Sequence, residues 1–114
     1  MTESVVKMTV HWFVPLGESR SITDALHGIM IRARARRDCL GCSLATEAGP
    51  HVRVRYAEEW ADESSLRREL RSDRFSTLAV LMESATEPPT VEIMLPGGTR
   101  GLDYVEEVRA TELL

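Results

Sequence analysis

Two cysteines separated by two residues are the pair whose chemistry is easiest to name. Cys39 and Cys42 form a C-x-x-C motif, which in a thioredoxin-like setting is a redox pair with its first thiol activated at a helix N-terminus. Here the motif follows the C-terminus of an expected helix, where the helix dipole disfavours a thiolate. A zinc site would need two further ligands, and the sequence has no second such pair. We therefore interpret both thiols as small apolar groups that pack at the start of a strand.

The three histidines, His11, His27 and His51, are too scattered in the sequence for a linear metal-binding motif. His11 lies on an expected strand beside Trp12 and is a candidate base or hydrogen-bond donor of a pocket. His27 adjoins the apolar stripe of an expected helix and is placed to line a pocket beneath that helix. His51 falls in an expected turn, where a solvated side chain is the simplest interpretation.

Most of the few aromatic residues belong to one group, which consists of Trp12, Tyr56, Trp60 and Phe75. If the strands that carry them are neighbours, some of these side chains gather beside a cavity between sheet and helices. Such a cavity suits a flat organic ligand. The alternative is that they form ordinary core, because large aromatic residues dominate the packing of small domains.

Arginines cluster along one expected helix and suggest a basic patch, which consists of Arg32, Arg34, Arg36 and Arg37. On a helix these side chains fan over much of the circumference, and acidic residues lie close by. We therefore interpret them as a solvated, salt-bridged face. The formal net charge of −4 also argues against nucleic acid as a partner, because phosphate binding needs a basic surface.

The elements that must position these side chains are organised around residues 54–82. Alternation along the chain predicts a strand, one face of which carries Val54, Tyr56, Glu58 and Trp60. Asp62 is an N-cap for a short helix, and Ser72 or Asp73 caps a second, longer helix after a break. The apolar stripe of the longer helix consists of Phe75, Leu78, Leu81, Met82 and Ala85.

The rest of the chain completes an α+β pattern. Residues 5–14 alternate as a first strand, residues 18–38 carry a helical apolar stripe, and residues 91–95 alternate as a last strand. A second strand around residues 42–46 and a turn at 48–51 form a hairpin with the next strand. The order is β-α-β-β-α-β, which predicts a ferredoxin-like fold with a four-stranded antiparallel sheet and helices on one face.

Size and composition describe one globular domain over residues 1–114. The chain is 43% hydrophobic and 28% charged, an ordinary globular composition, and its 114 residues are enough to bury a single core. We expect a core at residues 5–95 and a tail at 96–114, which docks on the domain or on a partner subunit. No apolar run approaches the ~20 residues that cross a bilayer, and no secretory signal is recognised, so we expect a cytoplasmic protein without membrane contact.

A single layer of helices would leave one face of this sheet bare. That face carries apolar residues on the first and last strands whichever phase of the alternation is chosen. Exposing such an area is unusual in a monomer. A second copy of the chain would cover it with two-fold symmetry, so we predict a homodimer that forms through the open face of the sheet.

The strand that ends at Trp60, followed by the Ser72-x-x-Phe75 start of a helix, resembles the antibiotic biosynthesis monooxygenase domain family. The resemblance covers roughly residues 5–95 and rests more on the order of elements than on any single motif. It implies a dimeric α+β barrel with a ferredoxin-like monomer. The family includes cofactor-independent monooxygenases that oxidise phenols or quinols with substrate-derived electrons, haem-degrading members, and members without known activity.

Individual positions separate the chain from the haem-degrading branch of that family. Glu69 stands where many members have a histidine and where the haem-degrading branch has a tryptophan. Ala79 stands where that branch has a further histidine, and its first-strand asparagine is missing because the chain contains no asparagine. We therefore expect neither haem degradation nor a cofactor.

The leading hypothesis is a cofactor-independent monooxygenase that oxidises a small phenolic or quinol substrate with O₂. A deprotonated phenol can pass an electron to oxygen, so the protein needs only to bind, desolvate and deprotonate it. The catalytic candidates are His11, as the base, and Glu69, and the candidate pocket residues are Trp12, His27, Tyr56, Trp60 and Phe75. The alternative is a non-catalytic dimeric module that binds or senses a small ligand. Glu69 and the absence of asparagine and glutamine favour this alternative.

Overall fold

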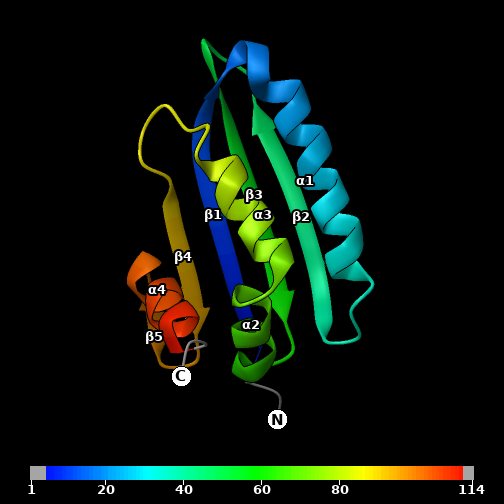
Figure 1. Cartoon of the computed structure of the whole chain (residues 1–114), viewed down its shortest axis with the longest axis vertical. Coiled ribbons are helices and arrows are strands. Elements are labelled where there is room, and N and C mark those ends of the chain that lie inside the picture. Colours follow the sequence, from blue (N-terminus) through cyan, green and yellow to red (C-terminus); the bar gives the residue numbers. More distant parts are fainter. Residues whose placement is uncertain (1–4, 112–114) are drawn as a thin grey trace.

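Helices cover one face of an antiparallel sheet in the computed structural model, which describes residues 5–111 (Figure 1). The strands, in the spatial order β2-β3-β1-β4-β5, are β1 (Val6–Pro15), β2 (Cys39–Glu47), β3 (His51–Trp60), β4 (Thr90–Leu95) and β5 (Gly98–Arg100). The helices are α1 (Ser19–Arg34), α2 (Glu63–Leu70), α3 (Asp73–Met82) and α4 (Leu102–Thr111), with a short 3-10 helix, η1 (Leu16–Glu18), before α1. The predicted α+β, ferredoxin-like arrangement is confirmed.

The sheet has one strand more than the four predicted. After β4 the chain turns at residues 96–97 and runs back as β5, which pairs Gly98 with Leu95. Gly98 has a φ of +140°, a backbone conformation that residues with a side chain rarely adopt. The glycine-rich segment at residues 96–98, which the sequence places at the start of the tail, is therefore the tight turn of a hairpin.

The helical segment between β3 and β4 is split in two, as the sequence predicts, because two N-caps follow one another. The Asp62 carboxylate accepts a hydrogen bond from the Ser65 amide at 2.8 Å at the start of α2. The Ser72 hydroxyl accepts one from the Phe75 amide at 3.3 Å at the start of α3. The break between the two helices brings the last turn of α2 close to the first turn of α3.

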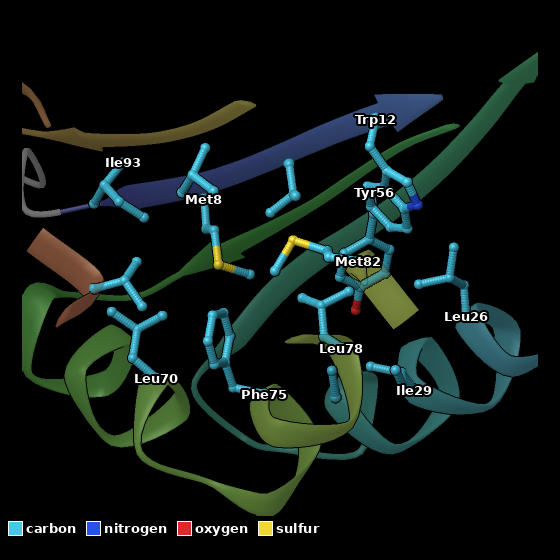
Figure 2. Close-up of a cluster of buried hydrophobic side chains, with 14 of the residues drawn as sticks. Met8, Trp12, Leu26, Ile29, Tyr56, Leu70, Phe75, Leu78, Met82 and Ile93 are labelled. Atoms are coloured by element: carbon cyan, nitrogen blue, oxygen red, sulfur yellow. The ribbon is translucent and has the colours of Figure 1, made fainter. Parts of the chain in front are cut away.

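The core lies between the sheet and the helices. Every second side chain along β1 and β3 points toward the helices and is buried, and the register pairs Val10 with Tyr56 and Trp12 with Val54. Figure 2 shows part of this layer, in which the strand side chains meet those of the helices. Its apolar members include Met8, Trp12, Leu26, Ile29, Leu70, Phe75, Leu78, Met82 and Ile93.

The opposite face of the sheet mixes apolar and charged side chains. Phe13 on β1 is 38% exposed, and Met94 on β4 is 48% exposed. Arg53, Arg55 and Glu92 are exposed on the same face, because they alternate with the buried residues of their strands. The apolar residues expected on the first and last strands are thus present, with charges interspersed among them.

Helix α4 packs against α2 and β4. The Tyr104 hydroxyl donates to the Glu63 carboxylate at 2.6 Å. The Arg109 guanidinium donates to the Leu70 carbonyl and lies 5.4 Å from the centre of the Phe75 ring. Neither α4 nor another helix within residues 5–111 is both long enough and apolar enough to cross a membrane.

Candidate functional site

A glutamate on the covered face of the sheet is the centre of the candidate site. Glu58 on β3 is 1% exposed, because it lies on the covered face of the strand together with Tyr56 and Trp60. Both carboxylate oxygens accept hydrogen bonds. The Tyr56 hydroxyl donates to Oε2 at 2.6 Å, and Trp60 Nε1 donates to Oε1 at 3.1 Å. The two aromatic side chains therefore hold this carboxylate inside the core.

The surroundings of Glu58 change its acidity. Burial raises the pKa of Glu58 from 4.5 to about 7, and the nearby Glu69 carboxylate adds to the increase. The hydrogen bonds from Tyr56 and Trp60 and the positive charge of Arg74 act in the opposite direction. Burial and the Glu58 carboxylate raise the pKa of Tyr56 above its usual range, so its hydroxyl stays protonated and donates. A carboxyl group whose pKa is raised toward neutrality suits a general acid or base.

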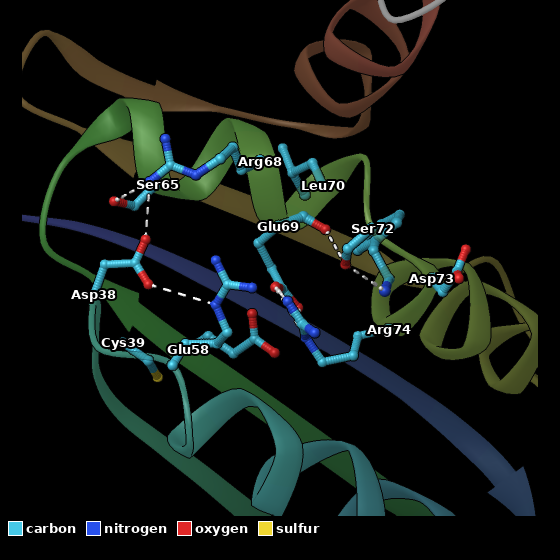
Figure 3. Close-up of polar contacts among 12 residues, drawn as sticks. Asp38, Cys39, Glu58, Ser65, Arg68, Glu69, Leu70, Ser72, Asp73 and Arg74 are labelled. Atoms are coloured by element: carbon cyan, nitrogen blue, oxygen red, sulfur yellow. Dashed lines mark hydrogen bonds and ion pairs between the residues drawn. The ribbon is translucent and has the colours of Figure 1, made fainter.

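A second buried carboxylate, Glu69, is paired with an arginine close to Glu58. Glu69 belongs to the last turn of α2 and is 3% exposed. Arg74, in the first turn of α3, donates from Nη2 to Oε1 at 2.6 Å, and its Nε lies 3.1 and 3.2 Å from the two carboxylate oxygens. Figure 3 shows Glu58, Glu69 and Arg74 in one region between β3 and the two helices. We call Tyr56, Glu58, Trp60, Glu69 and Arg74 the carboxylate cluster.

A hollow of about 290 Å³ opens next to the carboxylate cluster. Trp60 and Glu69 belong to its lining, so the hollow is one side chain away from Glu58. An ion pair of 3.0 Å between Arg68 and Asp38 also contributes to the lining. The other lining residues are Arg36, Ser65, Arg71, Ser72 and Arg74. The volume is near the lower end of those of ligand pockets, so it suits a ligand with a single aromatic ring.

The carboxylate cluster has the groups needed to move a proton. Within residues 5–111 no three histidine, cysteine or acidic side chains are arranged to hold a metal ion. Glu58 can take up or release a proton near neutral pH. Arg74 can stabilise negative charge that develops on a molecule bound in the hollow, which it helps to line.

Three of the predicted site residues, Tyr56, Trp60 and Glu69, meet at Glu58. His11 is not among them. It alternates on β1 with fully buried residues and therefore points to the open face of the sheet. The role of His11 as the base of a pocket stays a prediction. Any such pocket would lie on the open face of the sheet and not beside Glu58.

The remaining three predicted residues lie apart from the carboxylate cluster. His27 is exposed on α1. Trp12 and Phe75 are buried among apolar side chains (Figure 2). Trp12 Nε1 has no hydrogen-bond partner within residues 5–111. The aromatic residues thus divide, with Trp12 and Phe75 in the apolar core and Tyr56 and Trp60 bonded to Glu58.

Sequence reasoning did not single out two members of the cluster, Glu58 and Arg74. Glu58 does carry a signal, since an acidic residue between Tyr56 and Trp60 on the apolar face of a strand must be buried. Arg74 carries no such signal. Its pairing with Glu69 depends on the geometry of the break between α2 and α3.

Comparison with known proteins supports the fold at low sequence identity. No family model matches the sequence, and no curated protein matches it significantly. Among solved structures, one named antibiotic biosynthesis monooxygenase has a TM-score of 0.67 and 18% identity, and the match covers 78% of this chain and 95% of that chain.

Two further solved structures show the same similarity. A conserved protein from Methanosarcina mazei Go1 has a TM-score of 0.70 and 19% identity, with 81% of this chain and 92% of that chain covered. A protein of unknown function from Bacteroides thetaiotaomicron VPI-5482, described as a possible oxidoreductase, has a TM-score of 0.70 and 14% identity, with 82% and 98% covered. At these identities the similarity shows the fold alone, which this chain shares with the structure named antibiotic biosynthesis monooxygenase.

Proposed function

We propose that this chain is a cofactor-independent monooxygenase that oxidises a small phenolic or quinol substrate with O₂. The fold shared with a structure named antibiotic biosynthesis monooxygenase supports the reaction class. The observation that carries the proposal is Glu58. It is a buried carboxyl group with a pKa of about 7, held one side chain behind a hollow of single-ring size.

In the proposed mechanism the substrate lies in the hollow with its hydroxyl group toward Glu69. The hydroxyl proton passes to Glu58 through Glu69, which lines the hollow, and Arg74 stabilises the phenolate. The phenolate gives an electron to O₂, and recombination of the two radicals forms a carbon–oxygen bond. The O–O bond then breaks. One oxygen atom stays in the quinone product, and the other leaves as water with the proton lost from the attacked carbon and the proton held by Glu58, so all electrons come from the substrate.

We also propose that the chain works as a homodimer formed through the open face of the sheet. Phe13 and Met94 are exposed there, and a second copy would cover them. His11 lies on the same face, so its predicted role as a base would belong to the interface. A mass near twice the single-chain 12.8 kDa in light scattering at micromolar concentration supports the dimer, and a mass near 12.8 kDa contradicts it.

A non-catalytic dimeric module that binds or senses a small ligand is the second candidate. The lining of the hollow favours it, because among residues 5–111 four arginines and one aromatic residue, Trp60, take part. Such a lining suits a small anion held by charged hydrogen bonds better than a flat apolar molecule held between aromatic walls.

Oxygen consumption separates the two candidates. Single-ring phenols and benzoquinols, which match the size of the hollow, are supplied to the wild type, to Glu58→Gln and to Glu59→Gln, with naphthoquinols and anthrones as larger members of the panel. Glu58→Gln removes the proton acceptor, and we expect the rate to fall on the order of a hundredfold. Glu59 is the adjacent glutamate on the other face of β3. Glu59→Gln is therefore the matched control, and we expect it to keep the wild-type rate.

The same assay decides between the candidate bases. A rate that is unchanged in His11→Ala removes His11 from the mechanism. A rate that is unchanged in Glu58→Gln contradicts the mechanism proposed here. Binding of the panel compounds without any oxygen uptake would favour the non-catalytic module.

A further inference from the structure

The C-x-x-C motif at the start of β2 places its two thiols in contact. The Sγ atoms of Cys39 and Cys42 lie 3.6 Å apart. Residues three apart on a regular strand point to opposite faces of the sheet. Here the register shifts at Leu40, so Cys39 pairs with Trp60. Cys42 pairs with Glu58, and both thiols therefore lie on the face that the helices cover. The bulge brings together two side chains that regular strand geometry would separate.

The position of the motif allows the two sulfur atoms to approach further. A disulfide has a length of about 2.05 Å, so closure needs a movement of about 1.5 Å from the observed contact. The motif lies on β2, an edge strand that has one neighbouring strand, and it includes the bulge. Both cysteines are half-buried, which leaves the motif within reach of a small reagent.

The pKa of Cys42 determines which of the two thiols reacts first. Burial raises the pKa of Cys42 to about 12, and the Glu58 carboxylate and the Cys39 thiol add to the increase. Cys42 is therefore a poor nucleophile at neutral pH until a base takes its proton. Glu58 is the residue paired with Cys42 across the two strands and lies on the same covered face, so its carboxylate is placed to take this proton. The other titratable groups around Glu58 are Tyr56, Glu69 and Arg74.

We propose that Cys39 and Cys42 form a redox-active dithiol, which closes to an intramolecular disulfide by exchange with a small-molecule disulfide, and that Glu58 accepts the Cys42 proton. The Cys39 thiolate attacks the small disulfide, forms a mixed disulfide and releases one thiol. Cys42 passes its proton to Glu58, attacks Cys39 Sγ and releases the second thiol. Two protein thiols are oxidised as one small disulfide is reduced. This redox site does not depend on the proposed monooxygenase function.

Alkylation in glutathione redox buffers tests the closure. The full chain is equilibrated at increasing ratios of glutathione disulfide to glutathione, quenched with acid, alkylated with N-ethylmaleimide and measured by mass spectrometry. We expect both thiols to be lost together in one two-electron transition, without bound glutathione at its end. Two thiols that remain alkylatable in excess glutathione disulfide, or two bound glutathiones, would overturn the proposal.

Single-cysteine variants test the order of attack. We expect Cys42→Ala to accumulate one glutathione on Cys39, and Cys39→Ala to stay largely unmodified. The reverse result would overturn the assignment of Cys39 as the attacking thiol. The experiment on the wild-type protein tests disulfide formation itself, so that test does not depend on whether the single-cysteine variants fold.

Glu58→Gln tests the proton acceptor. The measured quantity is the rate at which the mixed disulfide on Cys39 converts to the intramolecular disulfide. We expect Glu58→Gln to slow this step on the order of a hundredfold, and Glu59→Gln, on the other face of β3, to leave it unchanged. A wild-type or faster rate in Glu58→Gln would overturn the role of Glu58.

Discussion

The two tryptophans on the covered face of the sheet lie at opposite ends of one core, and they differ in whether the indole N–H has a hydrogen-bond partner. Trp60 is 1% exposed and donates its Nε1 hydrogen to Glu58 at 3.1 Å. Trp12 is 2% exposed, and its Nε1 has no partner within residues 5–111. Polar groups are thus collected at the Trp60 end, next to the hollow. The Trp12 end is filled with apolar side chains (Figure 2).

This difference favours a chemical role for the carboxylate cluster over a purely structural one. Replacing a buried ion pair by well-packed apolar residues is often neutral or stabilising. The Trp12 end shows that this core can be built from apolar side chains. Two carboxylates at the other end therefore cost stability, and a function in proton transfer gives a reason for their presence.

The largest expected effect on stability is that of removing Arg74. Arg74→Ala leaves Glu69 buried without its partner, and we expect the free energy of unfolding to fall by about 3–5 kcal/mol. Urea denaturation at neutral pH measures it. Arg53→Ala is the control, because the Arg53–Glu47 ion pair is solvent-exposed, and it should cost less than about 1 kcal/mol. Equal losses in the two variants would show that Arg74 does not compensate a buried charge.

The next effect is a dependence of stability on pH that comes from Glu58. Its pKa is raised from 4.5 to about 7 on folding, so the folded state binds more protons between these values. The stabilisation is fully present below about pH 4.5 and is lost as the pH rises through about 7, a change on the order of 3 kcal/mol. Urea denaturation of the wild type and of Glu58→Gln from about pH 5 to about pH 8 isolates this contribution. We expect a flatter profile for the variant, and parallel profiles would contradict the raised pKa.

The smallest effect is the difference between the two tryptophans themselves. Trp60→Phe and Trp12→Phe remove similar volumes, but only Trp60→Phe takes a hydrogen-bond donor from Glu58. We expect Trp60→Phe to cost about 1–3 kcal/mol more than Trp12→Phe in thermal or urea unfolding. Similar costs would remove the contrast between the two ends of the core.

Local patterns in the sequence were sufficient for the order of elements and for the split helix. The caps at Asp62 and Ser72 act within a few residues of themselves, so they could be recognised without the fold. The fifth strand could not, because a glycine-rich turn does not reveal whether the chain after it pairs.

The parts of the site that sequence reasoning missed depend on backbone irregularities. The bulge at Leu40 sets the contact between Cys39 and Cys42, and the break between α2 and α3 sets the Glu69–Arg74 pair. Periodicity describes regular strands and helices, so it gives no position for side chains at such breaks. Glu58 is different, because its burial follows from regular alternation.

The account rests on Glu58 as a buried carboxyl group that exchanges a proton near neutral pH, and an NMR titration tests this most directly. Glutamate carrying ¹³C at the side-chain carboxyl carbon is incorporated into the full chain, and Glu58→Gln identifies the Glu58 resonance. We predict that this resonance titrates with a midpoint of about 7, well above 4.5. A midpoint at or below 4.5 would contradict the account, because Glu58 would then be an ordinary ionised carboxylate at neutral pH.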